Sequence, residues 1–418
     1  RMLEGSFTIL ATDCRQPDIV VGARHDSPLV VGLGEGENFL GSDVAAFVAY
    51  TKRAMEVDQD QAVCVSADKV IVTDFDGNVV ENPKTYTVDW DASAAEKGGW
   101  DSFMDKEIHE DPAAVQRTLL GRFDANGGIT LDEVRIDEHD FKAIDKIIVV
   151  ACGTASYAGQ VAKYAIEHWV RIPVEIELAH EFRYRDPILT PRTLVVAISQ
   201  SGETMDTLMA LRHAREQGSK VLAICNTQGA SIPRESDAVL YTHAGPEVAV
   251  ASTKAFTAQV TACYILGLYL AQVRGNMFRD EIHQVLDSLK DMPRKIQWVL
   301  DTQPKTIQAA AERMVNANSF LFLGRHVGYP VALEGALKLK EIAYTFTEGF
   351  AAGELKHGPI ALVDEGEPVV FIVPPQRGRN VLHAKVISGI EEVKARGAYI
   401  IAVAEQGDPD VERYADVV

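Results

Sequence analysis

Beyond about residue 140 the chain alternates between short apolar runs and amphipathic stretches of helical period. Apolar runs rich in β-branched residues occur at Lys146–Ala151, Leu194–Ile198 and Lys220–Cys225. Such runs, separated by helical patterns, are typical of buried parallel strands that are covered by helices on both faces. The pattern therefore predicts an α/β domain built on a parallel sheet.

The same order of elements returns further along the chain. The offset between matching strands is roughly 175 residues, which indicates a duplicated unit. The second set comprises predicted strands at Ser319–Leu323, Pro368–Val373 and Tyr399–Val403, and helices from about Pro330 to Tyr344 and through Val381–Arg396. We expect two tandem doubly wound, Rossmann-like domains over residues 141–290 and 311–418.

The first part of the chain has strand character instead. Predicted strands are Ser6–Thr12, Ile19–Ala23, Pro28–Leu33, Ala62–Ser66 and Val70–Asp74, with one helix near Asp43–Ala54. The residues from about Tyr86 to Asp140 are charged and contain few apolar runs. We expect a β-rich domain over residues 1–110 and a linker of short helices over residues 111–140.

One apolar segment, Ala255–Val273, is long enough to resemble a membrane span. Polar side chains interrupt it at Thr257, Gln259, Thr261 and Gln272, and no second such segment occurs. We therefore predict a helix of the core or of a subunit interface, and no membrane.

Length and charge narrow the possible partners. The chain has 418 residues and a formal net charge of −19, so two or three domains are expected and a nucleic-acid partner is not. Small phosphorylated ligands would have to be held mainly by neutral donors and helix N-termini.

The spacing of the cysteines fits neither a disulfide framework nor a zinc site. We expect reduced thiols, a cytoplasmic location, and no metal or cofactor. The five residues are Cys14, Cys64, Cys152, Cys225 and Cys263.

The strongest chemical signal is the stretch Ser199-Gln-Ser-Gly-Glu-Thr204, which lies between an apolar strand and a predicted helix. Hydroxyls, an amide and backbone N–H groups would converge there at the positive end of a helix dipole. We interpret the loop as a phosphate site that comprises Ser199, Gln200, Ser201 and Thr204. The alternative is an ordinary capping turn, since Ser and Thr are common N-cap residues.

Two further polar loops follow strands and precede helices, at Cys152–Ser156 and Val250–Lys254. Loops at the carboxyl ends of parallel strands can converge on one ligand, so we expect these two to join the phosphate loop. For Cys152 itself, a small buried residue at a strand end is a better interpretation than a nucleophile.

The second repeat adds ionisable groups. Glu334, Lys338 and Glu341 have the spacing i, i+4, i+7 and therefore share one face of an otherwise apolar helix. His357 follows in the irregular sequence Leu355-Lys-His-Gly-Pro359. A carboxylate, an amine and an imidazole suit proton transfer beside a sugar carbonyl. The alternative for the helix is a solvated salt-bridge stripe.

Together these strings resemble the isomerase half of the glutamine–fructose-6-phosphate aminotransferase family, also called glucosamine-6-phosphate synthases. The similarity comprises Cys152-Gly-Thr154, Ser199–Thr204, Val250-Ala-Ser-Thr-Lys-Ala-Phe256, Glu334-Gly-Ala-Leu-Lys-Leu-Lys-Glu341 and Gly353-Glu-Leu-Lys-His-Gly-Pro359. The first loops occur in many sugar-isomerase (SIS) domains, whereas the combination is specific. Residues 1 to about 110 resemble the C-terminal half of the family's α+β N-terminal-nucleophile glutaminase domain.

The resemblance implies that ammonia released from glutamine is transferred to fructose 6-phosphate, which is isomerised to glucosamine 6-phosphate. Glu341 would move the proton between C1 and C2, Lys338 would assist, and His357 would open the ring from a neighbouring subunit of a homodimer. The implied substrate-binding residues are Cys152, Gly153, Thr154, Ser199, Gln200, Ser201, Thr204, Val250 and Ser252.

The family's N-terminal catalytic Cys and its C-terminal reactive Lys have no counterpart in this sequence. We therefore expect a piece of a longer chain that does not hydrolyse glutamine by itself. Ala155 stands where many relatives have Ser. Two other functions stay open: an SIS-type amino-sugar-phosphate deaminase or deglycase, and a sugar-phosphate sensor without catalysis.

Overall fold

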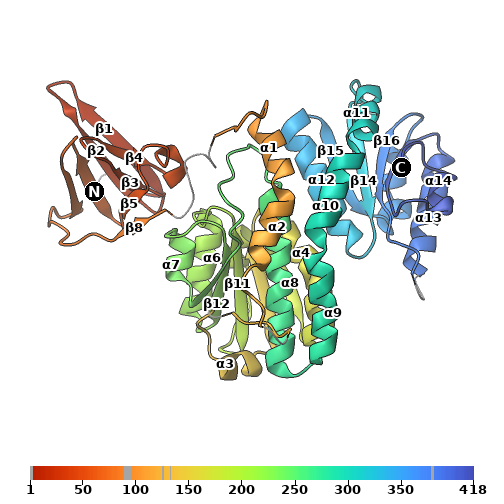
Figure 1. Cartoon of the computed structure of the whole chain (residues 1–418), viewed down its shortest axis with the longest axis horizontal. Coiled ribbons are helices and arrows are strands. Elements are labelled where there is room, and N and C mark those ends of the chain that lie inside the picture. Colours follow the sequence, from red (N-terminus) through yellow and green to blue (C-terminus); the bar gives the residue numbers. More distant parts are fainter. Residues whose placement is uncertain (1–2, 89–95, 125–126, 132, 378–380) are drawn as a thin grey trace.

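The computed structural model of the chain describes residues 3–88, 96–124, 127–131, 133–377 and 381–418. Figure 1 shows a β-rich unit at the N-terminal end, a central α/β unit and a second α/β unit towards the C-terminus.

Two antiparallel sheets form the N-terminal unit, and they pack face to face. Val31 and Met55 of one sheet meet Val63 and Val72 of the other in a shared apolar core. The strand orders are β1–β2–β6–β7 and β4–β3–β5–β8. The strands are β1 (Phe7–Asp13), β2 (Gln16–His25), β3 (Val30–Leu33), β4 (Asn38–Gly41), β5 (Arg53–Glu56), β6 (Gln61–Val65), β7 (Val70–Asp74) and β8 (Thr85–Thr87). All five predicted strands are present.

The helix predicted near Asp43–Ala54 is wrong. The segment forms only a short 3-10 turn, Val44–Ala46, and its last residues belong to β5. The spacing of Val44, Phe47 and Val48 resembles a helix because all three pack against one face of the second sheet. Thr51 then redirects the chain, since its hydroxyl donates to the Leu33 carbonyl at 2.6 Å.

The central unit contains a five-stranded parallel sheet in the order β10–β9–β11–β12–β13. Alternate residues of its strands face opposite sides, so Ile147 and Val149 pack under α4 and α8, whereas Ile148 and Val150 pack under α5–α7. The strands are β9 (Lys146–Ala151), β10 (Val174–Leu178), β11 (Thr193–Ser199), β12 (Lys220–Cys225) and β13 (Ala238–Tyr241). The helices are α4 (Gly153–Val170), α5 (Ala179–Arg185), α6 (Met205–Glu216), α7 (Ser231–Glu235) and α8 (Lys254–Arg274).

The second α/β unit repeats this plan in the order β15–β14–β16–β17, again parallel. Helix α12, which follows β14, packs against α4 of the central unit. The ring centroids of Tyr164 and His326 lie 4.3 Å apart at that contact. The elements are β14 (Ser319–Gly324), α12 (Gly328–Ala343), β15 (Phe346–Ala351), β16 (Pro368–Ile372), α13 (Val381–Lys394), β17 (Tyr399–Val403) and α14 (Pro409–Glu412). The predicted duplication of a doubly wound α/β unit is confirmed.

The predicted linker is not a free connection. Helices α1 (Phe103–His109), α2 (Asp111–Leu119) and α3 (Glu138–Ala143) precede the central sheet. Val115, Leu119 and Phe141 belong to the same apolar cluster as α8. This segment therefore forms one wall of the central unit, because most of its few apolar residues are turned inward, although Leu120 is exposed. The domain boundaries themselves stay predictions.

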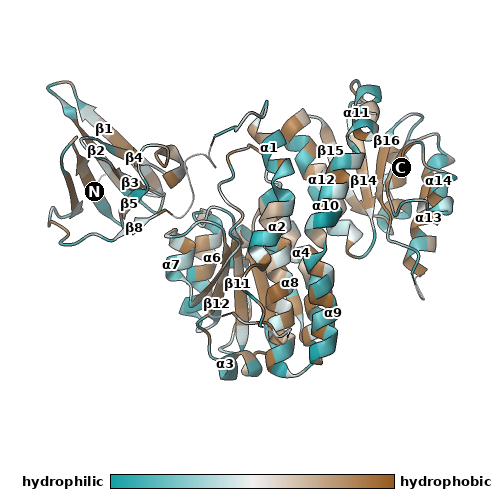
Figure 2. Cartoon of the chain, in the orientation of Figure 1, coloured by the Kyte–Doolittle hydropathy of each residue, from teal (hydrophilic) through white to brown (hydrophobic). Residues whose placement is uncertain are grey.

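Helix α8 packs against both α4 and α2. By length and composition it could cross a membrane, but 61% of its apolar window is buried inside the protein. In Figure 2 the strands of the central sheet are coloured mainly as hydrophobic. Helices α9 (Arg279–Lys290), α10 (Met292–Thr302) and α11 (Pro304–Arg313) then lead to the second unit.

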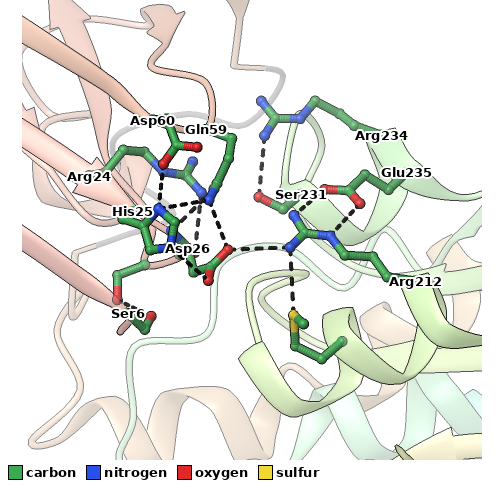
Figure 3. A network of polar contacts seen from close by, with 12 residues as sticks. Ser6, Arg24, His25, Asp26, Gln59, Asp60, Arg212, Ser231, Arg234 and Glu235 are labelled. Atoms are coloured by element: carbon green, nitrogen blue, oxygen red, sulfur yellow. Dashed lines mark hydrogen bonds and ion pairs between the residues drawn. The ribbon is translucent and has the colours of Figure 1, made fainter. Parts of the chain in front are cut away.

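The N-terminal unit contacts the central unit through ion pairs. The Arg212 guanidinium binds Glu235 in two bonds of 2.8 Å and reaches Asp26 of the N-terminal unit at 3.3 Å. Arg234 similarly reaches Glu56 at 2.9 Å. Figure 3 shows the Arg212 part of this network, with Arg234 beside it.

The crossing of α4 and α8 generates a first prediction, at Gly267. A Cβ atom there would lie 2.8 Å from Cγ1 of the buried Ile166. We expect Gly267→Ala to lower the unfolding midpoint by about 2 to 4 °C, because overpacking outweighs the better helix propensity of Ala. Differential scanning calorimetry measures the change.

Gly389 of α13 provides a matched control. Its Cβ would meet only Phe371, at the ordinary contact distance of 3.8 Å. Gly389→Ala should leave the midpoint unchanged or raise it. Equal midpoints for the two variants would contradict the close crossing.

Candidate active site

The loop between β11 and α6 is a compact, self-supporting turn. Gly202 has φ +72°, and a Cβ atom there would lie 2.6 Å from the Cβ of Ala230 and 2.7 Å from the Sγ of Cys225. Only glycine fits this position. The Gly202 N–H donates to the Oγ of Ser199 at 3.0 Å, which ties the turn to the end of the strand.

The hydroxyls of this loop are held next to one another. The Oγ atoms of Ser199 and Thr204 lie 3.0 Å apart, and Ser201 accepts a 3.2 Å bond from the Glu203 N–H. One of the Ser199 and Thr204 hydroxyls uses its O–H within this pair, whereas a hydroxyl that only accepts still has its own O–H to donate. The loop thus presents neutral donors at the N-terminus of the twelve-residue helix α6, a suitable environment for an anion.

The predicted loop at Cys152 lies beside the phosphate loop, because β9 and β11 are neighbours in the parallel sheet. Cys152 Sγ lies 4.0 Å from Thr207 Oγ1 in the first turn of α6. Burial raises the pKa of the Cys152 thiol, which argues against a nucleophilic role. Gly153, with φ +53°, begins α4.

A polar cluster joins the two α/β units. Thr154 of α4 donates to Oε1 of Glu334 at 3.1 Å and accepts from the Lys338 ammonium at 2.8 Å. The same ammonium lies 3.1 Å from Glu341 and 3.4 Å from Glu334. The predicted helix face is therefore real, and it is turned towards the first unit rather than towards solvent.

The burial of Glu334 was not predicted from the sequence. The spacing placed it on the correct face, but no pattern distinguished it from a surface carboxylate. It is only 6% exposed, and its Oε2 is buried without a hydrogen-bond partner. Burial raises the pKa of this carboxyl to about 7, against the opposing effects of Lys338 and Thr154. The group can therefore hold or release a proton near neutrality.

Lys338 and Glu341 keep partial access to solvent, with side-chain exposures of 17% and 32%. An ammonium fixed between two carboxylates can stabilise negative charge on a substrate oxygen while a carboxylate accepts a proton. This arrangement suits proton transfer next to a carbonyl group.

The third predicted loop lies just before α8 and has no regular secondary structure. Val250 is 87% exposed, and Ser252 is half-buried. Among the described residues, no hydrogen bond joins either of them to the phosphate loop or to Lys338.

His357 is not part of the polar cluster. It lies exposed in the 3-10 turn Glu354–His357, and within the described part of the chain no contact links it to Lys338 or Glu341. One chain therefore brings together two of the three predicted catalytic residues.

A cavity of about 590 Å³ adjoins the phosphate loop on the side of the N-terminal unit. Gln200, Asn226 and Lys254 line it from the central unit, and Tyr86 lines it from the N-terminal unit. Its volume is adequate for a small metabolite.

One group of side chains elsewhere has the composition of a metal site: His383, Asp408 and Asp410. His383 Nε2 lies 2.7 Å from Asp408, and Asp408 also accepts from the backbone N–H groups of Asp410 and Val411. These bonds cap α14 and attach it to α13, which is a sufficient structural role.

The family model described as SIS domain matches residues 141–269 and 313–418. A relative from Corynebacterium diphtheriae, named glutamine–fructose-6-phosphate aminotransferase [isomerizing], is 67% identical over 414 residues, 99% of this chain and 66% of the relative. A relative of the same name from Streptomyces coelicolor is 63% identical, over 99% of this chain and 67% of the relative. The chain belongs to the glutamine–fructose-6-phosphate aminotransferase family. It spans about two thirds of the length of these aminotransferases.

A solved structure agrees with this assignment. The C-terminal domain of a glucosamine-fructose-6-phosphate aminotransferase from Francisella tularensis has a TM-score of 0.71 and 40% identity, and the match covers 77% of this chain and 87% of that domain. The fold of the aminotransferase isomerase half is thus shown, whereas the roles of individual residues stay proposals.

The buried carboxyl of Glu334 predicts a specific pH dependence. Its folded pKa of about 7 exceeds the ordinary value of 4.5, so the folded protein binds more protons than the unfolded chain between these values. Stability must then fall as the pH rises through this window. We expect Glu334→Gln to gain stability relative to wild type, on the order of 1 to 3 kcal/mol, between about pH 5 and pH 8. Urea unfolding at several pH values measures the difference.

Glu312 of α11 offers the control, because it is an exposed carboxylate. Glu312→Gln should change stability by a constant small amount. A flat difference between Glu334→Gln and wild type across the pH range would show that Glu334 is ionised throughout.

Proposed function

We propose that the full-length protein makes glucosamine 6-phosphate from fructose 6-phosphate and ammonia derived from glutamine, and that this chain carries the isomerase half. The main support for this proposal is the contact of Thr154 with Lys338 and Glu334, beside the hydroxyl loop Ser199–Thr204. Phosphate donors and proton-transfer groups then lie at the same edge of the central sheet, where its parallel strands β9 and β11 end.

The phosphate is bound by Ser199, Gln200, Ser201 and Thr204 in this proposal. Three or four neutral hydrogen bonds and the α6 dipole can hold it without an arginine, which suits a protein of strongly negative net charge. The sugar is contacted by Cys152, Gly153 and Thr154 after strand β9. Val250 and Ser252, in the loop before α8, contact it as well.

Glu341 is the base that moves a proton between C1 and C2. Removing a proton from carbon beside a carbonyl or imine places negative charge on the heteroatom, and the Lys338 ammonium stabilises it. Glu334 holds Lys338 in place from the buried side, since it accepts from Thr154 and faces the same ammonium.

His357 requires a second subunit in this scheme. The side chain is exposed and, among the residues that the structure describes, makes no hydrogen bond or ion pair with the cluster of its own chain, so a homodimer would bring it to the neighbouring site to open the sugar ring. The N-terminal unit would contribute to the glutaminase domain, and we infer a cytoplasmic location for the whole protein.

A deaminase or deglycase would need the same phosphate loop but no N-terminal unit. In this chain that unit lines the cavity next to Gln200, and Arg212 binds its Asp26. The close relatives also carry the aminotransferase name. These observations favour the synthase.

Glu341→Gln in the full-length protein tests the proposal. The loss of the base should reduce proton exchange at C1 and C2 of fructose 6-phosphate by about 100-fold or more, while sugar binding is retained. Deuterium exchange followed by NMR measures the rate, and glutamine-dependent formation of glucosamine 6-phosphate distinguishes synthase from deaminase.

Lys340, exposed on the same helix, supplies the control. Lys340→Gln should exchange at the wild-type rate. Full exchange activity in Glu341→Gln would overturn the assigned role, and an inactive wild-type protein would overturn the function.

A further inference from the structure

Five side chains of the α1–α2 segment hold the chain from Thr242 to Thr257, which comprises an irregular stretch and the first turn of α8. Arg117 donates to the carbonyls of His243 and Ala244, and Thr118 donates to that of Thr242. Glu110 binds the buried Lys254 ammonium at 2.5 Å, and Asp111 accepts from Thr257. The fifth side chain, Glu107, binds the chain between the contacts at Ala244 and Lys254.

Glu107 binds the segment at two consecutive backbone positions. Its Oε1 accepts from the N–H of Val248 at 2.6 Å and from the N–H of Ala249 at 3.1 Å. The residue is 1% exposed, and its Oε2 is buried without a hydrogen-bond partner. Burying a carboxylate while one of its oxygens has no hydrogen-bond partner costs desolvation free energy, which lowers the stability of the fold. Its presence therefore calls for a reason other than stability.

The residues that follow this contact supply a reason. Val250 and Ser252, assigned to the sugar pocket in the proposed function, come directly after Ala249. On their other side, Oε1 of Glu247 accepts from the N–H groups of Thr253 and Ala255 at 3.0 and 3.2 Å. The short piece between the two carboxylates is thus fixed at both ends, although Val250 itself is exposed.

We propose that Glu107 is a positioning residue, which holds the loop from Val248 to Thr253 so that Val250 and Ser252 face the bound sugar. The helical pair α1–α2, which the sequence suggested was a linker, is then the outer support of the sugar site. This inference rests on the proposed function, because it uses the sugar contacts assigned there.

The test uses three variants of the full-length protein. Glu107→Ala removes both acceptor bonds, so we expect the KM for fructose 6-phosphate to rise about tenfold or more, while the KM for glutamine stays at its wild-type value. Glu107→Gln keeps a carbonyl oxygen for both N–H groups, so its KM for the sugar should stay within about threefold of wild type.

Arg274→Ala is the matched control for destabilisation. Arg274 donates to the carbonyls of Phe141, Lys142 and Ile144 at the opposite end of α8. Its loss should lower the unfolding temperature without changing the KM for the sugar.

The outcomes separate the two ideas. A wild-type protein that does not convert fructose 6-phosphate refutes the proposed function. If the wild type is active, any of three results refutes the positioning role: Glu107→Ala keeps the wild-type KM for the sugar, Glu107→Gln raises that KM as much as Glu107→Ala does, or Arg274→Ala raises it to the same extent.

Discussion

The site depends on the contacts of one cation, the Lys338 ammonium. It lies between Glu334 and Glu341 of its own helix and donates to the Thr154 hydroxyl of the other α/β unit. Without this cation, two carboxylates would face each other at a partly desolvated contact, which is unfavourable. The packing of α4 on α12, the equivalent first helices of the two repeats, is what brings these groups together.

Three carboxylates around the site share one arrangement. Glu107, Glu203 and Glu334 each bind with one oxygen, and each has a second oxygen that is buried without a partner. Burial raises the pKa of all three groups. Glu203 fixes the phosphate loop to Ser231, Glu107 fixes the loop before α8, and Glu334 faces Lys338. The protein therefore gives up stability where the position of a backbone or an ammonium matters.

Local patterns predicted the elements whose burial is decided within a few residues. Buried strands such as Lys146–Ala151 and the tight turn at Gly202 are of this kind. Prediction failed where distant packing decides the outcome: Phe47 and Val48 mimic a helix because they cover a sheet, and the charged α1–α2 segment conceals a few inward apolar residues. The pKa of Glu334 likewise depends on its burial in the tertiary fold and on neighbours such as Thr154, which lies 180 residues away in sequence.

The most direct measurement is a crystal structure of the full-length protein with fructose 6-phosphate bound. The account predicts that the phosphate accepts hydrogen bonds from the hydroxyls of Ser199, Ser201 and Thr204, and that C1 and C2 lie beside Glu341 and Lys338. A phosphate bound away from this loop, or a sugar whose C1 and C2 lie beyond the reach of Glu341, would contradict it.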